Sequence, residues 1–161
     1  MKQLNPVQIG HLGECYVMYS LATLGTKAMK VPDSLDFDLL TNDPIKIEVK
    51  TGVERVEVRK RPTKKEGFFC ITDRPHWQFA NNKSKIIFCN GNAKHINLGR
   101  KRICDYYVLV CLKINLKVEK TYIIPSEVVN HRRLIKIGTT DKGMFEKYNE
   151  TWHLIRESCE V

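Results

Sequence analysis

Acidic and basic side chains alternate with apolar ones in two neighbouring segments, residues 35–40 and 45–50. The first segment reads Leu-Asp-Phe-Asp-Leu-Leu and the second reads Ile-Lys-Ile-Glu-Val-Lys. A period of two predicts a pair of β-strands. The residues between them, Thr41 to Pro44, are turn formers, and Pro44 fits poorly in a two-residue turn. We therefore predict a hairpin whose loop is Asn42 to Pro44.

Antiparallel pairing through this loop places Asp38 opposite Glu48 and Asp36 opposite Lys50. Directly opposed residues share one face of a sheet, with Cβ atoms roughly 5 Å apart. Two carboxylates this close repel each other unless a proton or a cation lies between them, and hard oxygen ligands suit Mg²⁺. Lys50 lies on the same side and could orient an attacking water or stabilise charge on phosphorus. The alternative is a solvated hairpin face with an ordinary ion pair between Asp36 and Lys50.

Asp38 together with Glu48-Val49-Lys50 resembles the hallmark of the PD-(D/E)XK nuclease superfamily, an Asp on one strand and Glu-x-Lys on the next. The stretch from Gly10 to Glu14, Gly-His-Leu-Gly-Glu, is similar to the first helix of many members. Residues 104–110 and 122–126 resemble the later strands of small restriction and homing-type members. The resemblance extends from residue 5 to about residue 130.

The hallmark acid has three candidates in this sequence. The literal Pro-Asp pair is Pro32-Asp33, so Asp33, Asp36 or Asp38 could take the role. We favour Asp38, because it combines an apolar strand setting with a position opposite Glu48. Residues 51–103 have no residue-by-residue counterpart in the family pattern, and we interpret them as a β-rich insertion with basic loops.

The resemblance implies a restriction-endonuclease-like α/β fold, with a central mixed β-sheet flanked by helices, in a single domain over residues 1–161. It implies a Mg²⁺-dependent endodeoxyribonuclease that cleaves duplex DNA, in which Mn²⁺ could substitute. The implied catalytic residues are Asp38, Glu48, Lys50 and Glu14, and the implied metal ligands are Asp38, Glu48 and the carbonyl of Val49. A site-specific restriction or homing enzyme is favoured over a Holliday-junction resolvase. Cleavage of both strands implies a homodimer or a higher homo-oligomer.

The chain is strongly basic. It has 27 Lys and Arg against 18 Asp and Glu, a formal charge of +9, which favours a polyanionic partner such as double-stranded DNA. Two clusters are candidate DNA-backbone contacts: Arg55, Arg59, Lys60, Arg61, Lys64 and Lys65, and then Arg100, Lys101 and Arg102. A non-catalytic basic DNA-binding module, with a purely structural acidic hairpin, is the competing interpretation.

Other features limit the alternatives. The sequence has no apolar run of the ~20 residues that span a bilayer and no signal-peptide pattern, so we expect a cytoplasmic protein. Its six cysteines lack disulfide-framework spacing, and free thiols are expected. The Cys and His intervals lack the short Cys-x2-4-Cys knuckle, so zinc is not expected.

The remaining elements are read from local patterns. Asn5-Pro6-Val7-Gln8 predicts the start of a helix over residues 6–24, ended by Gly25. Residues 26–31 are a short strand or connector, and Asn90-Gly91 predicts a hairpin. We expect Trp77 in the core, a helical turn at 127–130, a strand at 134–137 and a closing helix over 144–156.

Overall fold

The computed structural model describes residues 4–62, 69–81, 84–89, 92–97, 103–139 and 143–157. Within residues 57–62, 69–74, 84–89 and 92–97 it describes the backbone alone. The elements in chain order are α1 (Pro6–Thr23), β1 (Ala28–Lys30), β2 (Leu39–Thr41), β3 (Lys46–Val53), β4 (Arg55–Pro62), β5 (Phe69–Ala80), β6 (Ser84–Cys89), β7 (Asn92–Asn97), β8 (Tyr106–Leu112), β9 (Val118–Pro125), α2 (Ser126–Val129), β10 (Leu134–Gly138), the 3-10 turn η1 (Glu146–Tyr148) and α3 (His153–Glu157).

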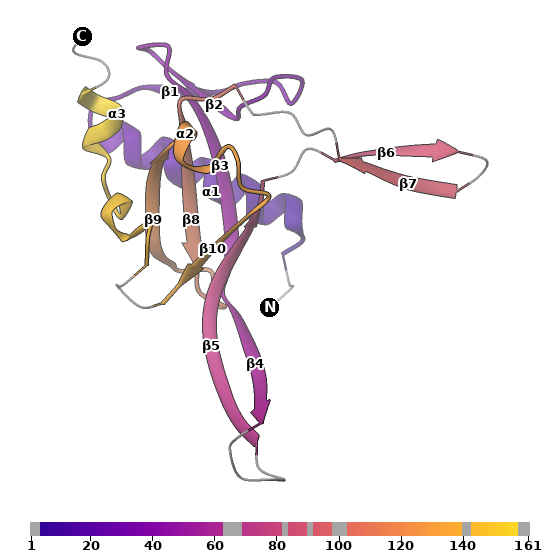
Figure 1. The fold of residues 1–161 in the computed structure, drawn as a ribbon. Helices are drawn as coiled ribbons and strands as arrows, with labels where there is room; N and C mark the ends of the chain where they lie inside the picture. Colours follow the sequence, from indigo (N-terminus) through magenta and orange to yellow (C-terminus); the bar gives the residue numbers. More distant parts are fainter. Residues whose placement is uncertain are drawn as a thin grey trace.

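A five-stranded mixed sheet forms the centre of the molecule, in the order β1-β2-β3-β8-β9 (Figure 1). The central strand β3 pairs in parallel with β8, and the other neighbours are antiparallel. A second sheet, β10-β5-β4, lies beside it, and its β4 and β5 continue away from the body as a two-stranded ribbon. This architecture confirms the predicted mixed sheet with flanking helices.

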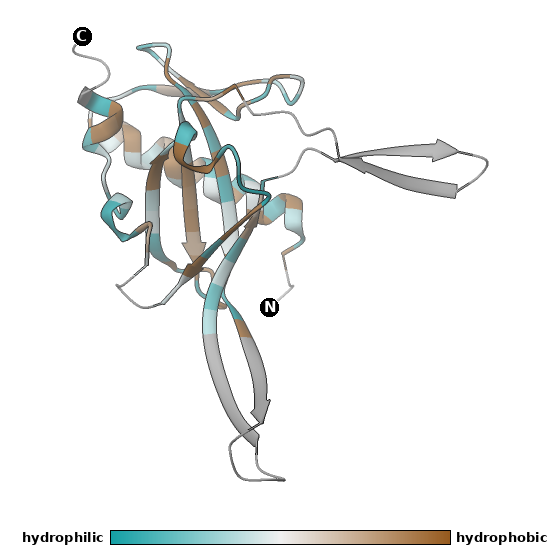
Figure 2. Cartoon of the chain, viewed as in Figure 1, coloured by the Kyte–Doolittle hydropathy of each residue, from teal (hydrophilic) through white to brown (hydrophobic). Residues whose placement is uncertain are grey.

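The central sheet has an apolar core on each face, because strands β3, β8 and β9 are buried on both sides (Figure 2). Helix α1 covers one face, where Val17 and Leu21 belong to the same buried cluster as Ile47, Val49 and residues of β8. The other face carries Trp77 and Phe79 of β5, packed in one cluster with Tyr107 and Leu109 of β8. Consecutive residues of β3 therefore enter different environments.

Helix α1 begins as predicted. The Asn5 side chain accepts a hydrogen bond from the Gln8 N–H at 2.9 Å, and the Gln8 side chain accepts one from the Asn5 N–H at 3.0 Å. Pro6 occupies the first turn, and Gly25 has φ +85° just beyond the helix, a conformation that favours glycine. The capping box thus fixes where the chain enters the helix.

Several shorter predictions are also confirmed. Strands β1 and β10 and helix α2 lie where a short strand, a second strand and a helical turn were expected. Trp77 is fully buried, and its Nε1 donates to the Leu112 carbonyl at 2.8 Å. The β6–β7 hairpin pairs Cys89 with Asn92, although the Asn-Gly dipeptide itself lies outside the described residues.

The predicted closing helix over residues 144–156 is wrong in its middle. The chain forms the 3-10 turn η1, then an extended segment, and finally the short helix α3. The extended segment pairs with the outer edge of β9, where Asn149 bridges Tyr122 and the Glu150 N–H donates to the Thr121 carbonyl at 2.7 Å. Satisfying this sheet edge outweighs the helical apolar rhythm of the segment.

Gly13 is where α1 lies closest to β3. A Cβ at Gly13 would overlap Thr51 Oγ1 and lie 2.9 Å from Thr51 Cβ, whereas a Cβ at Gly10, on the same helix, meets nothing within 4 Å. We expect Gly13→Ala to lower the free energy of unfolding in urea by about 2 kcal/mol, because the helix must move off the sheet. Gly10→Ala is the control and should raise it by up to about 1 kcal/mol through helix propensity. Equal stability of the two variants would contradict this packing.

Candidate active site

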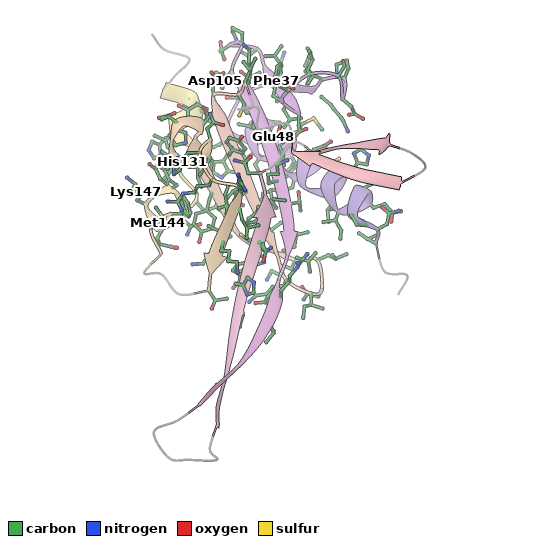
Figure 3. All side chains as sticks on the ribbon, turned by 45° about the vertical axis from the view of Figure 1, so that its right-hand side comes forward. Phe37, Glu48, Asp105, His131, Met144 and Lys147 are labelled. Carbon is green, nitrogen blue, oxygen red and sulfur yellow. The ribbon has the colours of Figure 1, made fainter. Side chains whose placement is uncertain are left out.

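Strand β3 presents the predicted site residues Glu48 and Lys50 to the face opposite α1. Ile47 and Val49 belong to the core beneath α1, and Thr51 lies against Gly13. Because side chains alternate along a strand, Glu48 and Lys50 project to the other face. The register with β8 places Glu48 next to Tyr107 there. Glu48 is in the body of the molecule, away from the ribbon formed by β4 and β5 (Figure 3).

Glu48 and Lys50 form a buried ion pair. Glu48 Oε1 lies 2.5 Å from Lys50 Nζ, and the exposed fractions of the two side chains are 1% and 21%. Carboxylates are rarely taken out of water unless they are paired or bind a metal. A cation therefore already lies against the Glu48 carboxylate on the face that carries the predicted Glu-x-Lys element.

The hairpin has the predicted loop, and Asp38 directly precedes its first strand. Leu39 pairs with Ile47, and the Thr41 N–H donates to the Ile45 carbonyl at 3.1 Å, so the loop is Asn42 to Pro44. The paired residues begin with Leu39 opposite Ile47, so Asp38 lies just outside the ladder. The Asp38 N–H also donates to the Ile47 carbonyl at 2.9 Å, which holds the residue beside β3.

The predicted first strand, residues 35–40, is too long. β2 begins only at Leu39, and the residues before it form a turn in which the Leu35 N–H donates to the Pro32 carbonyl. Pro32 has no N–H to extend a ladder, and the turn formers that follow it favour this bend. The predicted pairing of Asp36 with Lys50 is therefore wrong, and Lys50 pairs with Glu48 instead.

The Asp38 carboxylate extends the hydrogen bonding of the sheet just before β2 begins. Its Oδ2 accepts a hydrogen bond from the Val49 N–H at 2.8 Å, in the position that a further residue of β2 would take. The N–H and C=O of one residue point to the same edge of an extended strand, so the Val49 carbonyl also points toward Asp38. Asp33, by contrast, is exposed in the turn after Pro32.

Glu14 is positioned on the α1 side of the sheet, opposite the face of Glu48. Its Oε2 lies 2.7 Å from Lys30 Nζ and 3.4 Å from His11 Nδ1. The hydrogen bond from Lys30 to Glu14 is the main cause of a raised pKa at Lys30, and the negative charges of Asp33 and Asp38 raise this pKa further. The structure thus pairs Glu14 with Lys30, on the other face of the sheet from Glu48.

Lys30 and His11 were not singled out in the sequence. Lys30 is the last residue of β1, and no local motif distinguishes it from the other lysines of this basic chain. Only the pairing of β1 with β2, together with the packing of α1 on the sheet, brings these side chains to Glu14.

The structure describes only some residues of the two predicted basic clusters. Arg55 is exposed at the start of β4, and the backbone of Arg59, Lys60 and Arg61 continues that strand. The remaining members of the two clusters lie outside the described residues: Lys64, Lys65, Arg100, Lys101 and Arg102.

The donor set fits a hard divalent cation. Asp38, directly before β2, and Glu48 of β3 would supply carboxylate oxygens, and the Val49 carbonyl points toward Asp38; oxygen ligands of this kind suit Mg²⁺ or Mn²⁺. In the part of the chain that the structure describes, no three His, Cys, Asp or Glu side chains gather as a metal site. Within the same ranges, no helix is long and apolar enough to cross a membrane.

Comparisons with known proteins give a likeness in structure alone. No family model and no curated protein matches the sequence. Among solved structures, the chain is similar to the bacterial homing endonuclease I-Ssp6803I, with a TM-score of 0.65 and 20% sequence identity. The match covers 96% of this chain and 95% of that one. At this identity the likeness establishes a shared fold alone.

The hydrogen bond to Val49 predicts a structural role for Asp38. We expect Asp38→Ala to lower the free energy of unfolding by about 1–2 kcal/mol, because the Val49 N–H loses its acceptor at a partly buried position. Asp38→Asn retains an acceptor oxygen and should lose less. Asp33→Ala, at an exposed turn, is the control and should change stability by no more than about 0.5 kcal/mol. A larger loss of stability for Asp33→Ala than for Asp38→Ala, measured by urea unfolding, would contradict this structural role of Asp38.

Proposed function

We propose that this protein is a Mg²⁺-dependent DNA endonuclease of the PD-(D/E)XK type, with Asp38, Glu48 and Lys50 as its active site. The observation that carries this proposal is the buried pair of Glu48 and Lys50 on one face of β3, with the Asp38 carboxylate hydrogen-bonded to the Val49 N–H beside it. The fold that the chain shares with I-Ssp6803I, a homing endonuclease, supports the same assignment.

The energetics of the ion pair favour function over stability. Removing a carboxylate and an ammonium from water costs several kcal/mol per ion, and their attraction often does no more than offset this cost. An apolar pair of similar volume would serve the fold equally well. Buried charges with a specific partner occur preferentially where a protein carries out chemistry.

Asp38, Glu48 and the Val49 carbonyl would hold the divalent cation. When bound, this cation would lower the pKa of a water nucleophile and stabilise the 3′ oxygen that leaves the phosphorus. Glu48 is fixed by its position in the central strand, and Asp38 by the Val49 N–H. Both carboxylates are therefore oriented before any ligand arrives, which limits the ordering required on binding.

Lys50 supplies the positive charge at the reacting phosphate. Its Nζ lies against Glu48 and its side chain remains 21% exposed, so the ammonium is held at the boundary between core and solvent. From there it can donate to a water or to a phosphate oxygen as negative charge develops on the phosphorus. Hydrolysis at this centre would leave a 5′ phosphate and a 3′ hydroxyl.

The partner that fits the remaining features is duplex DNA. The +9 formal charge favours a polyanion, and the ribbon of β4 and β5 carries Arg55, Arg59, Lys60 and Arg61 away from the body of the molecule. A two-stranded ribbon can enter the major groove of DNA. We therefore favour a site-specific enzyme that acts as a homodimer, with one active site for each strand.

A plasmid assay tests the activity directly. The protein should nick or linearise supercoiled plasmid in Mg²⁺ and should leave it intact in EDTA. Glu48→Ala and Lys50→Ala should each slow cleavage at least about a hundredfold, because each removes a charge at the reacting phosphate. Glu127→Gln, at an exposed position of α2, is the control and should cleave like the wild type.

The outcomes separate the competing functions. A protein that binds DNA but never cuts it, with or without Mg²⁺, would be a non-catalytic binding module. Cleavage of a four-way junction in preference to linear duplex would identify a resolvase. Undiminished cleavage by Glu48→Ala would refute the proposed active site.

The basic residues of β4 should contribute through charge. We expect the double variant Arg59→Gln/Arg61→Gln to weaken DNA binding and to reduce the slope of log K against log salt by about 2, because two phosphate contacts are lost. Fluorescence anisotropy with a labelled duplex measures both quantities. Lys27→Gln, in a surface segment before β1, is the matched control and should keep the wild-type slope.

A further inference from the structure

The ribbon of β4 and β5 leaves the body of the molecule at the pair Arg55 and His76, which we call the ribbon root (Figure 1). From His76 to its end, β5 pairs with β10 as well, whereas toward the tip the described residues of β5 pair with β4 alone. The residues just inside the root are Glu54, which precedes Arg55, and Trp77, which follows His76. The direction of the ribbon therefore depends on how Glu54 and Trp77 are held.

One carbonyl group holds both of these residues. The Glu54 N–H donates to the Leu112 carbonyl at 2.8 Å, and the Trp77 Nε1 donates to the same oxygen at 2.8 Å. Leu112 is the last residue of β8, and Leu112 and Trp77 are buried. Both strands of the ribbon are thus hydrogen-bonded to one point at the end of the central sheet.

Lys113, the next residue, contacts the same two side chains. Its Nζ lies 3.0 Å from Glu54 Oε1 and 5.7 Å from the centroid of the Trp77 ring, within the range of a cation–π interaction. The Glu54 side chain is only 12% exposed, whereas Glu119, whose Oε1 lies 3.4 Å from the same ammonium, is 41% exposed. The hydrogen bond to Glu54 is the main cause of a raised pKa at Lys113, so the ammonium stays charged at neutral pH.

Glu54 is also the single residue between β3 and β4, so the corner that it forms connects the proposed active-site strand to the ribbon. We propose that the ion pair of Glu54 with Lys113 fixes the angle at which the ribbon leaves β3, and thereby positions DNA held by the ribbon against Glu48 and Lys50. Glu54 and Lys113 are then positioning residues, which touch neither the metal nor the reacting phosphate. This inference rests on the proposed function, which supplies both the DNA and the active site.

The two members of the pair differ in what their removal leaves behind. Lys113→Met leaves the Glu54 carboxylate without its partner in a mostly buried position, so the corner must open to let water reach it. Glu54→Gln leaves no unpaired acid, because Lys113 retains Glu119 as a partner. Lys113→Met should therefore disturb the ribbon more than Glu54→Gln.

A distance measurement without DNA tests the inference. Spin labels on unnatural amino acids replace Tyr19, which is exposed on α1, and Thr63, the residue after β4, and double electron–electron resonance gives the distance between them. The otherwise wild-type protein and Lys113→Arg should give the same narrow distribution, because arginine keeps a charge that can reach Glu54 and the Trp77 ring. Lys113→Met should broaden the distribution about twofold, and Glu54→Gln should broaden it less.

The consequence for catalysis is measured on the unlabelled proteins. Lys113→Met should keep its Kd for DNA within about twofold, since the proposed phosphate contacts remain. Its cleavage rate constant at saturating DNA should fall about tenfold, because the scissile phosphate is misplaced. Lys113→Arg should cleave like the wild type. Lys117→Met, which removes an exposed lysine from the same turn, is the matched control and should change neither the distance nor the rate.

The outcomes separate this inference from the proposed function. A distribution that is unchanged in both Lys113→Met and Glu54→Gln refutes the role of the ion pair, whatever the activity. A broadened distribution with cleavage at the wild-type rate refutes the positioning of DNA. A broadened distribution in a protein whose wild type never cuts DNA supports control of the ribbon angle and refutes the endonuclease. Urea unfolding of every variant verifies that the fold is retained.

Discussion

The burial of the Glu48 carboxylate against Lys50 is the constraint around which the candidate active site is arranged. Glu48 lies on the central strand of the sheet with only 1% of its side chain exposed, 2.5 Å from the ammonium of Lys50. A charge in this position costs free energy that the fold must supply elsewhere, and the two apolar cores on either face of the sheet supply it. Burying the ion pair thus lowers the stability of the fold, and the apolar burial around it offsets this loss.

The neighbouring elements position charges around this pair. β2 begins at Leu39, and the carboxylate of the preceding residue, Asp38, accepts a hydrogen bond from the Val49 N–H of β3. On the opposite face, Gly13 lets α1 approach the sheet closely, and the same helix carries Glu14 to Lys30. The charged side chains therefore form two separate ion pairs, Glu48 with Lys50 on one face of the sheet and Glu14 with Lys30 on the face that α1 covers.

Local patterns in the sequence were sufficient for the hairpin register and for α1. The loop from Asn42 to Pro44 and the alternation after it predict the pairing of Leu39 with Ile47, and the capping box of Asn5 marks the helix start. Other features depend on contacts between elements, which local sequence patterns do not predict. The predicted closing helix gives way to pairing with the free edge of β9, and the ion pair of Glu14 with Lys30 depends on the packing of α1 against β1.

The central claim is that Glu48 and Lys50 are kept for chemistry and not for folding. The double variant Glu48→Gln/Lys50→Met removes both charges together, so neither is left unpaired, and it can be examined by urea unfolding and by Mg²⁺-dependent plasmid nicking on the same preparation. We predict a free energy of unfolding at least equal to that of the wild type, with nicking abolished. A loss of stability greater than about 2 kcal/mol, or nicking at the wild-type rate, would contradict the account.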